Sequence, residues 1–314
     1  MAEHLLSTVP NQSDQVAITG AMKAFSIPLT MAILAASAPR MLNAIELEPR
    51  TVQAWDEYTR TADSRMQARL DGRRTFLWVD EVADRLSCLR RGEILVAPVS
   101  GPGTRSAPNG LIHDWIGAIF IPNATVEGLF AVVHDYNRYK EFYKPVVADS
   151  KALACTKKDR TFSMVWQRQV VFINAAFESQ YHVREFGLDE RRGYSITATT
   201  RMQEIEGYGH SGAHLLPPGQ GTGFIWRLHS ILRYEERQEG LYLEMEAIAL
   251  TRDIPASLQW IVKPVVNHLS IASLAASLRQ TRDAVKSLPG PRERLALCAD
   301  RGCNPPKATA GAAN

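Results

Sequence analysis

The residues of this chain that could do chemistry are two adjacent His-Asp pairs, His113-Asp114 and His134-Asp135. Adjacent residues on a strand point to opposite faces, so we do not expect the first pair to cooperate. Neither pair comes with a Ser or Cys nucleophile placed by its context. The pattern therefore does not favour a catalytic triad, and no catalytic residue is assigned.

Metal and phosphate chemistry are not favoured either. His210 and His214 have the spacing of two metal ligands, but they lie in a Gly-rich loop and lack a third ligand. The string GQGTG at 219–223 lacks the Gly-Lys-Ser/Thr of a phosphate-binding loop and does not lead into a helix. We therefore expect no metal and no cofactor.

Size and composition are those of an ordinary globular protein. The chain has 314 residues, of which 45% are hydrophobic and 22% charged, with a formal net charge of +3. This length corresponds to one or two domains at about 100–200 residues each. The surplus charge is too small and too scattered to indicate nucleic-acid binding.

The cysteines form no Cys-x-x-Cys pair. They are Cys88, Cys155, Cys298 and Cys303. The last two are close enough in sequence to form a disulfide in an oxidising compartment, or all four are free thiols.

The N-terminal segment has features of an export signal. Lys23 is followed by an uncharged run over 24–38, whose about 15 residues match a signal-peptide core and are short for a membrane span. Cleavage after Ala44 would complete the signal, so residues 1–44 comprise a signal peptide and upstream residues, and we expect translation to start at Met22. This predicts a periplasmic or secreted protein. The alternative is a buried or disordered segment that is not a signal, in which case the protein is cytoplasmic.

The elements before the main domain form an N-terminal extension over 45–100. Residues 50–70 carry apolar side chains at helical spacing, and 93–99 alternate weakly as a strand does. The stretch 100–110 is rich in Gly, Pro and Ser, which indicates a loop, and we place the domain boundary there. The Pro-, Gly- and Ala-rich tail over 289–314 is predicted to be disordered.

Residues 111–288 predict one α+β domain. A strand over 111–121 is followed by a short helix that begins near Thr125. A long C-terminal helix follows the last strand, and Pro264 is expected to kink or divide it. Between the two helices lie five consecutive strands, joined by short turns, which predict an antiparallel meander. These strands cover about 161–172, 175–186, 193–205, 223–236 and 240–250.

Period-2 alternation assigns an apolar face of the sheet to the C-terminal helix. The opposite face is polar and expected to be wet, with Arg227 and His229 paired to Glu244 and Glu246 across strands. Large and small side chains mix on the apolar face, so either a cavity for a hydrophobic ligand remains or the helix fills the space. Arg168 binds a ligand anion, extends to the rim of the sheet, or is assigned to this face by an error of register. The candidate cavity residues are Phe162, Met164, Trp166, Arg168, Phe177, Tyr181, Tyr194, Ile196, Phe224, Trp226, Leu228, Leu243 and Met245.

Several strings in this order resemble a bacterial group of the START/polyketide-cyclase (SRPBCC) superfamily. They are HDWIGAIFIPNAT (113–125), DYNRYKEFYKPVVADS (135–150), LPPG followed by GFIWRL (216–228), EAIALTRDIP (246–255) and the helix 260–282. The resemblance covers 111–288 and, more weakly, 45–100. It implies the helix-grip fold, in which a curved antiparallel sheet wraps around a long C-terminal helix. It also implies a deep apolar cavity, which relatives use for lipids, sterols or polyketides.

Three functions follow from this interpretation. The first is binding or transport of a hydrophobic, lipid-like small molecule, with transient membrane contact as a possible accompaniment. The second is an enzyme of the aromatase/cyclase kind, although the apolar face shows no Asp, Glu or His for acid–base catalysis. The third is a protein-interaction module with a filled core. The oligomeric state is left open.

Overall fold

The computed structural model describes residues 47–156, 159–170, 173–218, 220–221, 225–253 and 259–288. Within them the helices are α3 (Pro49–Leu70), η2 (Trp78–Glu81), α4 (Ala83–Arg90), α5 (Val126–Val133), η3 (Tyr136–Arg138), α6 (Tyr139–Phe142) and α7 (Gln259–Ser287). The strands are β1 (Leu95–Pro98), β2 (Thr104–Ala107), β3 (Gly110–Pro122), β4 (Val147–Cys155), β5 (Asp159–Val170), β6 (Ile173–Gly187), β7 (Arg192–Glu206), β8 (His214–Leu215), β9 (Ile225–Arg237) and β10 (Gly240–Arg252).

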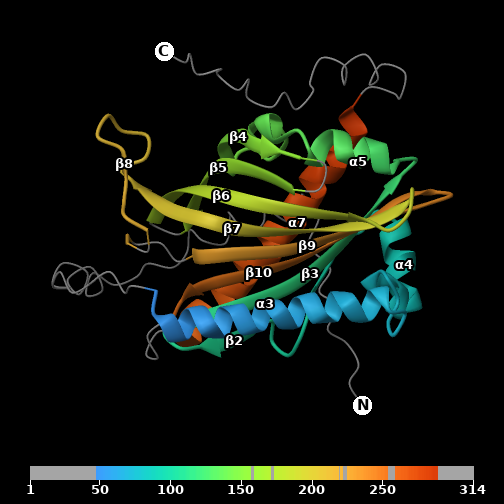
Figure 1. The fold of residues 1–314 in the computed structure, drawn as a ribbon, viewed down its shortest axis with the longest axis horizontal. Helices are drawn as coiled ribbons and strands as arrows, with labels where there is room; N and C mark the ends of the chain where they lie inside the picture. The colour runs from blue at the N-terminus through green and yellow to red at the C-terminus, as the bar shows by residue number, and fades with distance from the viewer. Residues whose placement is uncertain are drawn as a thin grey trace, which may run out of the picture.

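One antiparallel sheet organises these elements. Its strand order is β1-β3-β10-β9-β7-β6-β5-β4, with β2 added beside β3 and β8 beside β7. Figure 1 shows α7 crossing behind the sheet and α3 lying across its front. A curved antiparallel sheet around a long C-terminal helix is the helix-grip architecture, so the predicted α+β fold is confirmed.

The helix α7 packs mainly against β3. Leu274 and Leu278 of α7 are buried with Ile119 of β3 in the largest apolar cluster. Between them lies Gly117, where an added Cβ would be 2.6 Å from Leu278 Cδ1 and 3.1 Å from Leu274 Cγ. The absence of a side chain at Gly117 therefore lets the helix approach the strand closely. The helix includes Pro264 and is one element, so of the two predicted effects Pro264 does not divide it, and a kink there stays a prediction.

The face opposite α7 is covered, contrary to the expectation that it is wet. Helix α3 buries Trp55 and Met66 against this face, where they contact an apolar cluster that includes Ile112, Ile231 and Ile248. The segment η2–α4 buries a second cluster there. The N-terminal extension thus packs on the sheet and also contributes β1 to it.

Two charged or polar residues of β9 on this covered face, Arg227 and His229, pair with the extension, whereas Arg233 pairs across strands with Glu244 and Glu246. Arg227 lies 3.4 Å from Asp56 of α3, so its predicted pairing with Glu244 or Glu246 is wrong. His229 lies 3.4 Å from Asp63 of the same helix, and the same correction applies. Both predicted pairings fail because α3 covers this face and provides acidic partners where the sequence indicated solvent.

Three strands were not predicted. Strand β4 lies at the edge of the sheet and alternates poorly, with Leu153 45% exposed. Strand β2 forms inside the Gly- and Pro-rich stretch taken as a loop, and it pairs with β3. Strand β8 has two residues. Short or edge strands bury too little on one face to give a clear period-2 pattern.

Several predictions fall on residues that the structure does not describe. These are the signal over 1–44, the disordered tail over 289–314, the bridge between Cys298 and Cys303, and most of the GQGTG string. Export and the disulfide therefore stay predictions. Among the described helices, none has both the length and the apolar character needed to cross a bilayer.

Candidate ligand-binding face

Strand β7 carries an extra residue that moves two predicted site residues to the other face. The pairing of β6 with β7 shifts between Gln180 and Tyr181, and it skips Thr200. One added residue exchanges the two faces of the sheet for all side chains in the part of β7 before it. Tyr194 and Ile196 consequently lie in the cluster beneath α3. Their assignment to the α7 face is wrong.

The predicted face of Trp226 is wrong for the same reason, an irregularity in the strand pairing. Thr251 of β10 pairs with Ile225, whereas the preceding Leu250 pairs with Arg227, so the register skips Trp226. Its ring is 8% exposed and belongs to the cluster beneath α3. The residues that follow it on β9 keep the predicted alternation.

The aromatic side chains of β5 and β6 contact one another. Phe162 stacks on Tyr181 with ring centroids 4.8 Å apart, and its other side stacks on Tyr136 of η3 at 4.4 Å. Trp166 stacks on Phe177 at 4.5 Å. The rings are separate from the α7 cluster: among the described residues, neither of their two apolar clusters includes a residue of α7.

Between these aromatic rings and α7, the sheet keeps accessible apolar surface. Half-buried side chains on this face are Met164, Met202, Leu228, Leu232, Met245 and Ala247. On the opposite face of the same central strands, Ile231, Arg233, Glu244, Glu246 and Ile248 are at most 4% exposed. The α7 face is therefore the less completely filled of the two.

The remaining predicted residues divide into two groups. Leu243 is fully buried in the α7 cluster, and Met245 packs beside it. The side chains of Arg168 and Phe224 lie outside the described residues. The role of Arg168 toward an anionic ligand therefore stays a prediction.

The α7 face also contains a histidine that the candidate set lacked. His113 accepts or donates at both ring nitrogens, at 3.1 Å to Thr104 Oγ1 and 3.0 Å to Thr251 Oγ1. Thr104 in turn donates to Asn267 of α7 at 2.8 Å. Burial lowers the pKa of His113 to about 4, so its imidazole is neutral at ordinary pH. Counting the alternation of β3 back from Trp115 would have placed His113 on this face.

The first His-Asp pair does not form a dyad. Asp114 points to the α3 side, where it accepts from Tyr58 Oη and Arg65 Nη2, both at 2.8 Å. The expectation that His113 and Asp114 diverge is therefore confirmed. Nε2 of His134, from the second pair, lies 2.5 Å from Glu185 Oε1.

Metal binding finds no support in the described part of the chain, where no group of three or more His, Cys, Asp or Glu residues is placed to hold an ion. His214 instead lies 3.3 Å from Glu206 in an ion pair.

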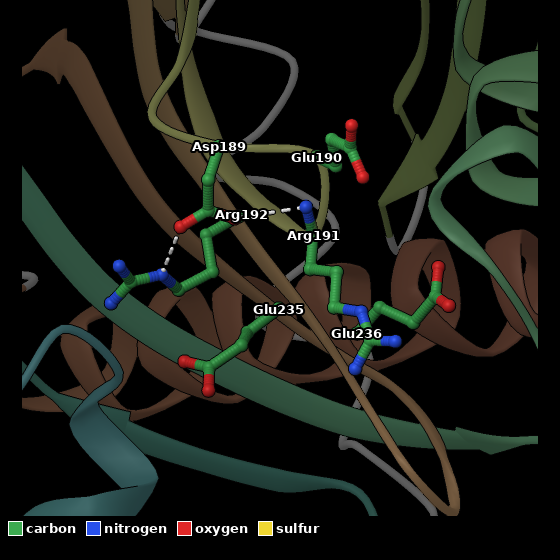
Figure 2. A pocket seen from close by; sticks show the side chains of 6 residues that line it. All are labelled: Asp189, Glu190, Arg191, Arg192, Glu235 and Glu236. Atoms are coloured by element: carbon green, nitrogen blue, oxygen red, sulfur yellow. Dashed lines mark hydrogen bonds and ion pairs between the residues drawn. The ribbon is translucent and has the colours of Figure 1, made fainter.

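A polar hollow of about 470 Å³ lies where the β6–β7 turn meets β9, and Figure 2 shows the six charged side chains that line it. Asp189 accepts from Arg192 Nε at 2.8 Å and from the backbone N–H of Arg191 at 2.9 Å. These contacts hold the pKa of Asp189 below its usual value, the Arg192 hydrogen bond most strongly. The hollow is a solvated set of paired charges and does not suit a hydrophobic ligand.

Comparisons with solved structures find proteins of the two kinds that the sequence resembles. A STAR-related lipid transfer protein fragment from Xanthomonas axonopodis aligns at 17% identity and a TM-score of 0.41, covering 62% of this chain and 93% of that chain. Human STARD10 aligns at 10% identity and 0.39, covering 64% and 80%. The Zhui aromatase/cyclase from Streptomyces sp. R1128 aligns at 14% and 0.36, covering 57% and 99%.

No protein-family model matches the chain, and no curated protein sequence is similar to it. The assignment to the helix-grip fold rests on the strand order and the placement of α7 described above.

Proposed function

We propose that this protein binds a hydrophobic, lipid-like small molecule between α7 and the β5–β9 part of the sheet. One observation carries the proposal: six apolar side chains on the α7 face stay half-buried, whereas Ile231, Arg233, Glu244, Glu246 and Ile248 on the other face are at most 4% exposed. Exposed apolar surface inside a fold is costly unless a ligand covers it.

The chemistry of this face suits such a ligand. Methionine, leucine and aromatic side chains dominate it, and methionine adapts its shape to ligands of irregular outline. Small-molecule sites combine such apolar walls with a few polar groups that orient the ligand. Ser230 and Thr197 provide such groups here, because the β7–β9 pairing brings them opposite each other.

The first experiment is gentle mass spectrometry of the protein purified from its native host, followed by solvent extraction. We expect a stoichiometric hydrophobic molecule. The purified apo protein should also take up a fluorescent fatty acid or sterol. A clean apo mass together with no uptake would contradict ligand binding and favour an interaction module with a filled core.

A variant pair locates the site. Leu228→Glu places a charge on the accessible α7 face, and we expect it to weaken uptake about tenfold or more, because a carboxylate cannot be desolvated there without a partner. Leu215→Glu is the matched control, since Leu215 is 39% exposed on β8 and away from this face. Equal uptake by both variants, with both folded by circular dichroism, would exclude this face as the site.

A further inference from the structure

A second pocket lies on the opposite face of the sheet, beneath the N-terminal extension. Its volume is about 240 Å³. The walls come from α3, η2, α4 and the strands β1, β3 and β10. Four of its ten lining residues are arginines, Arg65, Arg69, Arg74 and Arg85, and two are glutamates, Glu81 and Glu246. No feature of the proposed hydrophobic site requires such a pocket.

Positive charge is in excess at the Glu81 end. Glu81 Oε1 lies 2.9 Å from Arg69 Nη2 and 2.7 Å from Arg74 Nη2, and Glu81 Oε2 lies 3.6 Å from Arg85 Nη1. The other hydrogen bonds of two of these arginines go to neutral groups: Arg69 donates to the carbonyl of Thr75 at 2.6 Å, and Arg85 to that of Trp78 at 2.9 Å. Three guanidinium groups therefore share one carboxylate.

The other carboxylates nearby are already engaged. Glu246 and Asp114 both accept from Arg65, at 2.6 and 2.8 Å. Glu244 accepts from Arg233 at 3.1 Å and also from the backbone N–H groups of two η2 residues. The hydrogen bonds of these three carboxylates go to other partners, and only the charge of Glu244 also acts on Arg69 and Arg85.

Burial is the main cause that lowers the pKa of two of these arginines. Burial, followed by the positive charge of Arg233, lowers the pKa of Arg69, and Glu81 offsets only part of the effect. Burial also lowers the pKa of Arg85. A bound anion would favour the charged form of both side chains.

We propose that this pocket binds the phosphate group of a small phosphorylated molecule. A phosphate carries up to two negative charges, which matches the excess of guanidinium groups around Glu81. Its oxygens accept several forked hydrogen bonds at once, the geometry in which arginine binds best. The volume is several times the roughly 30 Å³ of one water, so it holds a phosphate and a small organic group.

The test is calorimetric titration of the full chain with inorganic phosphate and with glycerol 3-phosphate, at constant chloride. We expect both to bind and to raise the melting temperature. Tighter binding of glycerol 3-phosphate assigns a phosphorylated metabolite, and equal binding assigns free phosphate. Absence of binding by both at millimolar concentration would overturn the proposal.

Two adjacent arginines provide a matched pair of variants. Arg74 lines the pocket and is 47% exposed, whereas Arg73 is 67% exposed and pairs with Asp71 outside it. Arg74→Gln should weaken phosphate binding about tenfold, the usual loss for one charge-assisted hydrogen bond, and Arg73→Gln should leave it unchanged. Equal weakening in both variants would show general surface attraction and would contradict a built site. Uptake of the fluorescent fatty acid should be unaffected by either variant.

Discussion

Two neighbouring residues of β3 show how completely the two faces of the sheet differ. His113 faces α7 among hydroxyl groups, and its pKa is lowered to about 4. Asp114 faces α3 beside Glu246, and its pKa is raised to about 7 by burial and then by the charge of Glu246. Desolvation disfavours the charged form of each residue, which moves an acid and a base in opposite directions.

Asp114 should make the stability of the protein depend on pH. Its pKa is 3.8 in an ordinary environment and about 7 in the folded protein, so the folded state holds a proton that the unfolded state releases. The stability from this proton is complete below pH 3.8 and is lost as the pH rises through 7. Asp114→Asn should therefore gain stability relative to the wild type as the pH rises from about 4 to about 7, and the difference should be constant above that range.

Urea denaturation at several pH values measures this difference. The control is Asp71→Asn, because Asp71 is exposed and its pKa is lowered by hydrogen bonds from Gln67 and Arg73. That variant should follow the wild-type curve over the same range. If the free energy of unfolding changed with pH equally in Asp114→Asn and the wild type, Asp114 would be ionised over the whole pH range in the folded protein.

At the scale of elements, the contact of α7 with β3 depends on one missing side chain. Gly117→Ala places a Cβ against Leu278 and Leu274, both buried, so the helix or the leucines must shift. Overpacking of this kind costs about 1–3 kcal/mol. Thermal or urea unfolding measures the loss.

Gly187→Ala is the control for this substitution, because a Cβ at Gly187 meets no atom within 4 Å. It should leave stability within about 0.5 kcal/mol of the wild type. If the two variants were equally stable, the close approach of α7 to β3 would be contradicted.

Strong periodicity predicted the elements well. The helix predicted over 50–70 is Pro49–Leu70, and the long strands appear within a few residues of their expected bounds. Each of these elements buries one continuous apolar face, which leaves a clear period in the sequence.

Hydrophobic periodicity could not predict local irregularities in strand pairing. Thr200 and Trp226 are skipped by their partner strands, yet nothing in their residue types marks an interruption. A single extra residue exchanges the faces of a strand, so Tyr194 and Ile196 were assigned to the wrong one. Nor could the sequence show which face α3 covers, because an apolar stripe reveals that a helix is buried but not against what.

At the scale of the whole molecule, the N-terminal extension is part of the structure that the sheet needs. A chain that begins at residue 99 would expose Ile112, Ile231 and Ile248, all at most 3% exposed in the intact fold. It would also remove the two backbone N–H donors that Glu244 receives from η2. We expect this chain to aggregate or to bind a hydrophobic dye without a cooperative unfolding transition.

A chain that begins at residue 47 and keeps α3 is the control, and it should unfold cooperatively. A soluble, cooperatively unfolding chain from residue 99 would instead show that the extension is a separate domain, with the boundary at 100–110 that the sequence predicted.

The pairing of β3 with β10 has a consequence for biosynthesis. β3 pairs along its whole length with β10, the last strand, and all its residues except Pro122 are buried. While β4 to β9 are being translated, one edge of this apolar strand has no partner. At about 5–20 residues per second that wait is on the order of ten seconds. We therefore expect the nascent chain to need protection from aggregation until β10 has left the ribosome.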